Sequence, residues 1–122
     1  MREKVRDKER LKHILEAINN IEEFCIGKEF SDFVAEKILW FAIIKNLEII
    51  GEASYLITRD FRSKNPHIEW NAIIGMRHIL VHGYYQIRNE IIWATIEQDI
   101  PNLKSAIQKL ISDFPETDSE SE

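Results

Sequence analysis

The sequence predicts an all-α protein, an antiparallel bundle of four to five helices. Apolar residues recur at intervals of three and four along most of the chain, which is the spacing of amphipathic helices. The 122 residues include only four Gly and three Pro, so helices can run long. A chain of this length forms one domain with a single core, which we assign to residues 1–115.

The first helix is predicted from Arg2 to about Cys25, and Gly27 can end it. Basic residues at even positions from 2 to 12 surround this helix instead of sharing one face. This pattern indicates a solvated extension or else an arm that contacts RNA. Cys25 is the only cysteine, and we expect it to be a buried small apolar residue.

A second helix is predicted from Ser31, a suitable N-cap, to about Thr58. Its middle, residues 38–44, is apolar on every side. A domain of this size can rarely cover such a helix alone, so we expect a two-fold homodimer with this helix in or beside the interface.

Residues 59–67 form a basic connector, and Pro66 argues against a continuous helix through it. The next helix begins at about Trp70. Gly83 is expected to end it in the left-handed conformation. The expected buried residues of this helix are Trp70, Ile73, Ile74, Ile79, Leu80 and Val81.

The last helical region follows a short turn, with Asn89 as candidate cap. Apolar residues from Trp93 to Phe114 alternate spacings of three and four, the pattern of a bundle helix. Pro101 should bend or restart this helix near Asp99. Residues 116–122 contain no apolar side chain and are predicted to be a disordered acidic tail.

Charge is distributed unevenly along the chain. The net charge of −5 comes entirely from five acids after Lys109. Between Arg59 and Arg88, by contrast, there are five Lys or Arg and only two acids, and three of the four His also lie there. We therefore expect a local electropositive site. The chain has no run of 18 apolar residues, so we expect a cytoplasmic protein without membrane attachment.

Arg77 and His82 are the candidate catalytic residues. On a helix they are separated by about 7.5 Å of rise and roughly 140° of rotation, so a phosphate-sized group could lie between them. Arginine offers a charged fork matched to phosphate, and histidine offers a titratable nitrogen. Tyr84 and Tyr85 follow with rings for base stacking. A simpler interpretation is a surface ion pair and a cation at a helix end.

These residues carry a family resemblance. Arg77, His82 and Tyr84 form the pattern R-x-x-x-x-H-x-Y, which resembles the motif of the HepT-like toxins, members of the HEPN superfamily of small helical ribonucleases. Residues 46–53 are similar to the central-helix signature of that family, and residues 66–76 resemble its approach to the catalytic helix. Nearly the whole chain is covered, apart from the acidic tail.

The resemblance implies a metal-independent endoribonuclease toxin of a type VII-like HepT/MntA toxin–antitoxin pair, acting on tRNA or mRNA without a cofactor. Arg77 would bind the scissile phosphate and His82 would move the proton, with two copies meeting in a dimer cleft. An MntA-like nucleotidyltransferase antitoxin would neutralise the toxin by AMPylation of Tyr84, giving O-AMP-tyrosine.

The resemblance also suggests supporting roles near the motif. His78 departs from the family, which usually has Asn after the Arg, so its supporting role is open. Glu52 belongs to a polar line with Lys45 and Glu48. It either forms salt bridges on an exposed face or lies in the cleft and orients Arg77 or His82.

Other functions compete with this one. The chain could be a non-catalytic dimer that serves a partner nucleotidyltransferase as its nucleotide- or RNA-binding subunit. A metal site is a further alternative, since His78 and His82 lie four apart, but only two ligands are visible. Tyr84 could also be a mere packing residue. The chain has no Gly-rich phosphate loop or G-x-S-x-G elbow, which excludes P-loop enzymes, kinases and serine hydrolases.

Overall fold

The computed structural model describes residues 2–115, and within them all regular structure is helical, which confirms the all-α class. The acidic tail predicted for residues 116–122 lies outside the described residues. The elements in chain order are α1 (Arg2–Cys25), α2 (Phe30–Ala35), α3 (Lys37–Leu56), α4 (Arg59–Lys64), α5 (Trp70–His82), the 3₁₀ turn η1 (Tyr84–Gln86), α6 (Asn89–Ala94), the π-helical segment η2 (Thr95–Asp99) and α7 (Ile100–Asp113).

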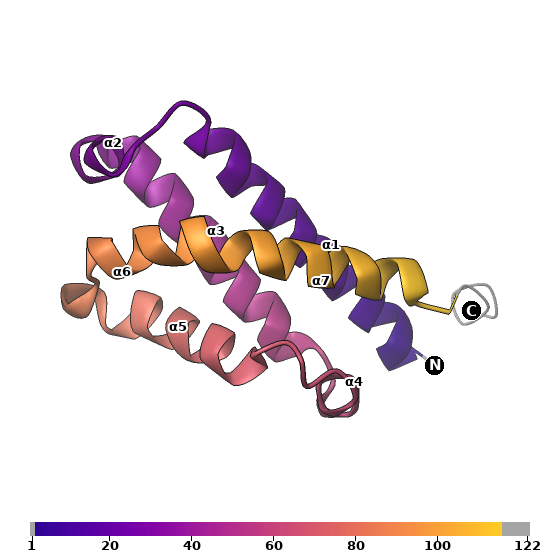
Figure 1. Cartoon of the computed structure of the whole chain (residues 1–122). Coiled ribbons are helices and arrows are strands. Elements are labelled where there is room, and N and C mark those ends of the chain that lie inside the picture. The colour runs from indigo at the N-terminus through magenta and orange to yellow at the C-terminus, as the bar shows by residue number, and fades with distance from the viewer. Residues whose placement is uncertain (1, 116–122) are drawn as a thin grey trace.

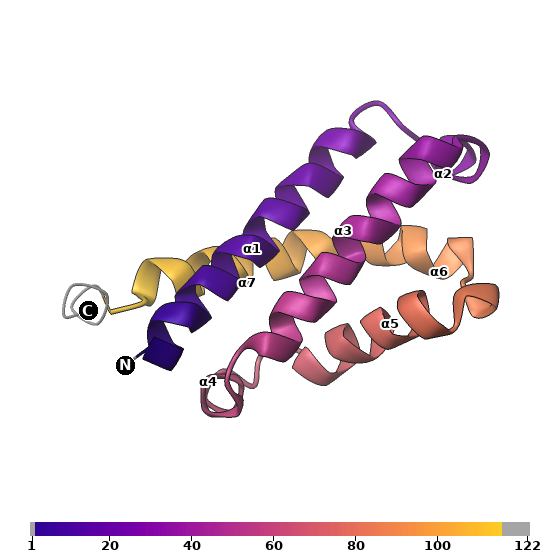
Figure 2. The same cartoon turned by 180° about the vertical axis from the view of Figure 1, so that it is seen from behind.

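Helices α1, α3 and α5 form a layer, and the segment from α6 to α7 crosses one face of it. Figure 1 shows α7 passing in front of α3, with α1 on one side and α5 on the other. The view from behind in Figure 2 shows α3 between α1 and α5. The core lies where α7 crosses this layer, because Ile14, Leu47 and Ile107 are almost completely buried there. Among residues 2–115, no helix combines the length and apolar character needed to span a membrane.

The first helix agrees with the prediction. It ends at Cys25, and Gly27 has a φ of +71°, a conformation that glycine adopts without a steric penalty. Its residues Leu11, Ile14, Ile18 and Ile21 are fully buried.

The single helix predicted from Ser31 to Thr58 is wrong. The chain breaks at Glu36, whose backbone is extended (φ −95°, ψ 102°), and this separates α2 from α3. The N-cap of α2 is Glu29 instead of Ser31, and its backbone N–H donates to the Asp32 carboxylate over 2.8 Å. The break lets α2 bury Phe33 completely against the Trp93 ring, at 5.4 Å between centroids. Long-range packing therefore decides this boundary.

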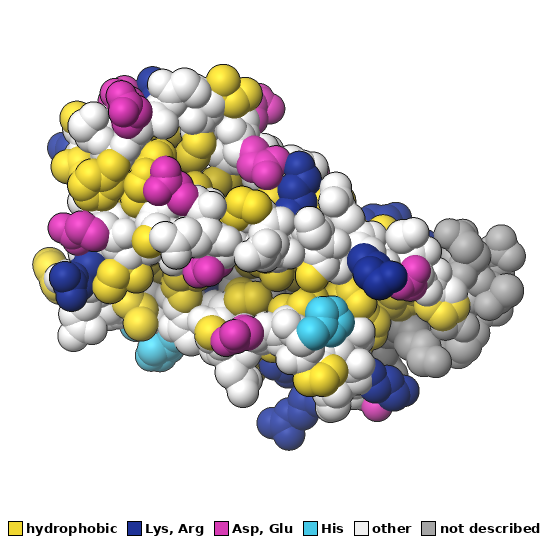
Figure 3. All heavy atoms as spheres, in the orientation of Figure 1, with side chains coloured by type: hydrophobic (Ala, Val, Ile, Leu, Met, Phe, Trp, Pro, Cys, Tyr) yellow, Lys and Arg dark blue, Asp and Glu magenta, His cyan; other side chains and the backbone are white. Residues whose placement is uncertain are grey.

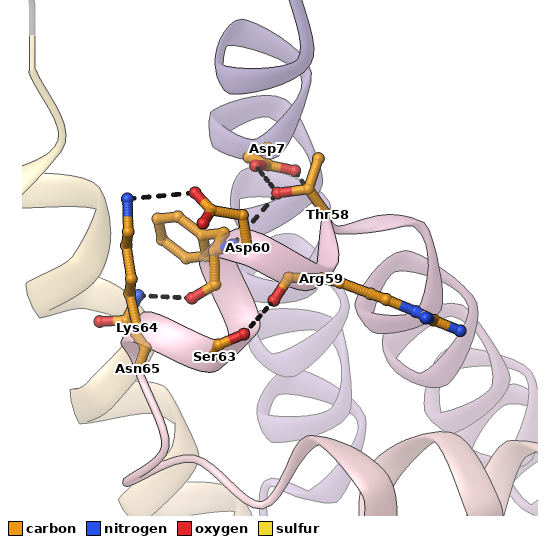
Figure 4. A network of polar contacts seen from close by, with 8 residues as sticks. Asp7, Thr58, Arg59, Asp60, Ser63, Lys64 and Asn65 are labelled. Carbon is orange, nitrogen blue, oxygen red and sulfur yellow. Dashed lines mark hydrogen bonds and ion pairs between the residues drawn. The ribbon is translucent and has the colours of Figure 1, made fainter.

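The basic connector contains a short helix, α4, that was not predicted from the sequence. Thr58 caps it, because its hydroxyl accepts a hydrogen bond from the Phe61 N–H at 3.2 Å. The buried Asp7 carboxylate of α1 accepts from both the backbone N–H and the hydroxyl of Thr58, at 2.9 and 2.7 Å (Figure 4). This contact fixes α4 to α1.

The last region restarts near Asp99, as predicted from Pro101. A π-helical segment precedes α7, and Pro101 lies in its first turn, where no intrahelical donor is lost. The prediction that Asn89 caps α6 is wrong, since Arg88 is the N-cap. Asn89 instead accepts a hydrogen bond from the Trp40 indole at 2.7 Å and joins α6 to α3.

Part of the predicted core is exposed. Ile79 and Val81 of α5 are 47% and 40% accessible, so the prediction that they are buried is wrong for a single chain. The exposed face of α3 also carries large apolar residues at helical spacing: Ile38, Phe41, Ile49 and Leu56. Figure 3 shows the opposite face of the molecule, where apolar side chains surface between scattered charges. The homodimer stays a prediction, and the uncovered apolar face of α3 is the feature that calls for one.

Candidate active site

Helix α5 is held unusually close to α3 at one point. A Cβ atom added to Gly51 would overlap the Cβ and Cγ of Arg77. Only glycine at position 51 allows the two helices to meet at this distance, so Gly51 sets the position of Arg77 relative to α3.

Arg77 forms an ion pair with Glu52. Its Nη2 lies 2.9 Å from Glu52 Oε1, and the two side chains are 32% and 47% exposed. Of the two alternatives for Glu52, the structure therefore shows contact with Arg77. Such a half-exposed pair adds little to stability, but it restricts the direction of the guanidinium.

The pair lies in a groove of about 390 Å³ whose walls are α1 and α5 and whose floor is α3. Its ionisable lining residues are Arg10, His13, Glu16, Lys45, Glu48, Glu52 and Arg77. Carboxylates and permanent cations are equal in number, so the groove has no strong net charge. Binding of an anion here would depend on individual side chains, and Arg77 is the cation whose direction is fixed.

His82 lies on a different flank of α5. Arg77 and Val81 line the groove, whereas His78 and His82 lie beyond it, with their rings 4.8 Å apart between centroids. His82 is the last residue of α5 and is exposed. Within one chain the structure does not bring Arg77 and His82 into the same groove.

The structure places no third ligand beside His78 and His82, the two candidate metal ligands, among the described residues. Within residues 2–115, no group of three or more His, Cys, Asp or Glu side chains is placed to hold an ion. The pair formed by His78 and His82 therefore remains two ligands, fewer than a protein metal site needs.

The end of α5 differs from the prediction. Gly83 has φ −108° and ψ 39°, so it is not left-handed. Its N–H donates to the Ile79 carbonyl at 2.8 Å, and a Cβ would lie 3.2 Å from that oxygen and from Gln86 Oε1. A larger residue at position 83 would crowd these two oxygens, so glycine is favoured there. The side chain of Tyr84 lies outside the described residues, so its predicted modification is untested, and Tyr85 is 98% exposed.

The α1 wall of the groove was not predicted from the sequence. Arg10, His13 and Asn20 line it, and Asn20 donates to the buried Asn46 side chain at 3.1 Å. Polar residues at 10, 13, 16 and 20 recur at intervals of three and four and so share one face of α1, and this spacing was the available signal.

Comparison with known proteins gives a consistent result. A family model described as "Ribonuclease HepT-like" matches residues 14–110. A protein of Thermococcus cleftensis named "Probable ribonuclease HepT" is 44% identical over 84% of this chain and 94% of its own length. "Putative RNase MJ1380" of Methanocaldococcus jannaschii is 38% identical over 78% and 87%, and "Putative RNase TTE0752" of Caldanaerobacter subterraneus is 38% identical over 83% and 90%. No solved structure matches the chain.

Proposed function

The chain belongs to the ribonuclease HepT-like family, and we propose that it is a metal-independent endoribonuclease that uses Arg77 and His82. The observation that carries this proposal is the Glu52–Arg77 ion pair, which presents an oriented guanidinium in a groove beside the helix that ends in His82. Relatives with 38–44% identity over most of the chain are named as ribonucleases.

The proposed chemistry is transfer of the phosphate ester from one ribose oxygen to another. His82 removes the proton from the RNA 2′-hydroxyl, and the 2′-oxygen attacks phosphorus. The bond to the 5′-oxygen breaks, and that oxygen takes up a proton from an imidazolium. The products are a 2′,3′-cyclic phosphate and a free 5′-hydroxyl.

Arg77 has the electrostatic role in this mechanism. Its guanidinium has five N–H donors, and Glu52 contacts one of its nitrogens, so donors remain for the scissile phosphate. Charge on the phosphoryl oxygens grows in the transition state, where a fixed cation stabilises it most. Glu52 is a positioning residue because it acts through Arg77.

A dimer would bring more groups to the substrate. Arg77 and His82 lie on different flanks of α5, so a strand bound across a two-fold axis could contact Arg77 of one protomer and His82 of its partner. The uncovered apolar residues Ile38, Phe41 and Ile49 on α3 lie on the same helix as Glu52 and support such an interface.

Regulation is the further part of the proposal. We expect the chain to be the toxin of a toxin–antitoxin pair whose partner is an MntA-like nucleotidyltransferase. Transfer of AMP to Tyr84 would add a bulky anion a few residues beyond Arg77 and compete for its phosphate site. Coexpression with such a partner, followed by mass spectrometry of the Tyr84 peptide, should show the mass of one added AMP.

The experiment that assigns the residues compares Arg77→Ala and His82→Ala with wild type on total RNA in EDTA. Each variant should lose at least about a hundredfold in rate, because general acid–base and electrostatic contributions are of this order. Lys109→Ala, an exposed residue of α7 paired with Asp113, is the matched control and should cut normally. Full activity in the two site variants, with the same fold by circular dichroism, would refute the assignment.

A non-catalytic RNA- or nucleotide-binding subunit is the second candidate. The position of His82 outside the Arg77 groove favours it. It predicts that wild type binds RNA but yields no product at any enzyme concentration, provided that Tyr84 is unmodified.

A further inference from the structure

A second cavity lies at the junction of α4 and α5. It is an open depression of about 1230 Å³, formed by the end of α3, by α4 and by the first turn of α5. Its polar and aromatic lining includes Tyr55, Arg59, Arg62, His67 and Glu69. The proposed catalytic chemistry uses none of these residues.

The arginines of this cavity are free of carboxylates. Among the described residues, neither Arg59 nor Arg62 forms an ion pair with a carboxylate. The nearby acids have other partners: Asp60 is paired with Lys64 at 3.1 Å, and Asp7 accepts hydrogen bonds from Thr58. The Arg62 Nε is buried without a hydrogen-bond partner. Figure 4 shows Arg59 extending away from the Asp7–Thr58 contact. Glu69 is the one acid among the described residues that line the cavity, so the lining, with its two arginines, keeps an excess of positive charge.

The position of α4 is fixed before any ligand binds. Thr58 caps the helix and is held by Asp7, and the Trp70 indole donates to the Asn65 carbonyl at 3.0 Å just beyond its other end. The short helix that carries Arg59 and Arg62 is thus anchored at both ends, so its backbone loses little entropy on binding. The first turn of α5 also lines the cavity, and the positive end of a helix favours an anion.

An exposed ring lies in the same cavity. Tyr55 is 60% accessible and lines the depression together with Arg59 and Arg62. A basic surface combined with an accessible aromatic ring is the combination that binds single-stranded nucleic acid, because the cations hold phosphates and the ring stacks on a base.

The cavity adjoins the groove of the candidate active site. Leu56 lines both this cavity and the groove that contains Arg77. From Trp70 at the cavity to Arg77 in the groove, α5 rises by about 10 Å. When the scissile phosphate of an RNA strand lies at Arg77, a neighbouring nucleotide of the same RNA can therefore reach the cavity beside α4.

We propose that the α4–α5 cavity is a second phosphate-binding subsite for single-stranded RNA. Arg59 and Arg62 bind the phosphate of a nucleotide that flanks the cleaved bond, and Tyr55 stacks on its base. This inference rests on the proposed ribonuclease function for its substrate, but it concerns binding and is measured without cleavage.

The test is binding of a short, fluorescein-labelled oligouridylate in which every sugar is 2′-O-methylated, followed by fluorescence anisotropy at several salt concentrations. The methyl groups prevent attack by the 2′-oxygen, so binding is measured whether or not the protein is a ribonuclease. The variants are Arg59→Ala with Arg62→Ala, Arg59→Ala alone and Tyr55→Ala. The double variant Lys104→Ala with Lys109→Ala removes the same charge from two ion pairs of α7, away from the cavity.

We expect roughly tenfold weaker binding by the double arginine variant. The slope of log affinity against log salt concentration should become shallower by about 0.7 for each phosphate that the variant no longer neutralises. Tyr55→Ala should weaken binding with little change in the salt dependence, because stacking involves no charge. Arg59 is exposed, so its single variant keeps the test valid if the double variant is unstable.

Equal weakening by the lysine control would mean that only net charge matters and would overturn the subsite. Wild-type affinity in the arginine variants would also overturn it, and would leave the ribonuclease proposal to its own cleavage assay. If wild type cuts RNA poorly but binds the oligonucleotide through Arg59 and Arg62, the subsite stands and the catalytic proposal fails.

Discussion

At the residue scale, Gly51 controls the position of Arg77. Gly51→Ala places a Cβ where the Arg77 side chain begins, so α5 must move away from α3. We predict a loss of about 1–3 kcal/mol in the free energy of unfolding, as for overpacked cores, together with loss of cleavage. Urea denaturation and the RNA assay measure the two effects.

Gly75→Ala is the matched control for this prediction. Gly75 lies inside α5, and a Cβ there would meet no atom within 4 Å. Because alanine favours helix over glycine, this variant should gain about 0.5–1 kcal/mol and keep its activity. If the two variants had the same stability and the same cleavage activity, Gly51 would not be needed for the close contact between α3 and α5.

Cys25 is a second residue with a measurable consequence. Cys25 is only partly buried, so the expectation of a buried residue holds in part. This partial burial raises the pKa of its thiol above the usual value, because the thiolate is less well solvated. A smaller fraction of the thiol is therefore ionised near pH 8, and we predict slower reaction with a thiol reagent than for a free cysteine peptide. The rate should rise when urea exposes Cys25. A native rate equal to that of the peptide would contradict this account.

The residue-level site was predicted only in part from the sequence. The spacing of Arg77 and His82 is a local property that the sequence carries by itself. The contact between Glu52 and Arg77 depends on how closely α5 approaches α3, which Gly51 permits, and the groove also needs Arg10 from α1. Contacts between distant segments have no local signal.

At the element scale, helix periodicity predicted α1 and α7 well, because each buries one stripe of apolar residues. For α5 it predicted the extent of the helix but not the exposure of Ile79 and Val81. It failed at Glu36, where neither Gly nor Pro marks the break between α2 and α3. That break is specified by Phe33 packing on Trp93 and by the Lys28–Glu36 ion pair, at 3.0 Å. Both contacts join residues that are separate in sequence.

The junction of α1 and α4 gives a test at this scale. Asp7→Ala would remove the acceptor of two hydrogen bonds from Thr58 at a buried position, so we predict a loss of about 1–3 kcal/mol. Asp60→Ala breaks only an exposed pair with Lys64 and should cost less than about 1 kcal/mol. Thermal denaturation compares the two, and equal losses would show that the Asp7–Thr58 contact does not anchor α4.

At the scale of the whole molecule, the uncovered face of α3 predicts a homodimer. Ile38 is 87% exposed and Phe41 is 51% exposed, so charging them should leave the single chain folded. We predict that wild type sediments as a dimer and that Ile38→Glu with Phe41→Glu shifts it to monomer and lowers cleavage. Ile91→Glu is the control: it places a charge at an exposed apolar residue of α6, outside the proposed interface, and should leave the dimer intact. A wild-type monomer with full activity would rule out a shared site.

The proposed reaction of the folded chain needs the RNA 2′-oxygen as nucleophile and no metal ion. The most direct measurement incubates unmodified protein in EDTA with an RNA and with its fully 2′-O-methylated copy, and analyses the product ends. We predict cleavage of the RNA alone, leaving 2′,3′-cyclic phosphate and 5′-hydroxyl ends. The mechanism would be contradicted if neither strand were cut in EDTA, whether or not the same protein cuts RNA in a parallel reaction without EDTA.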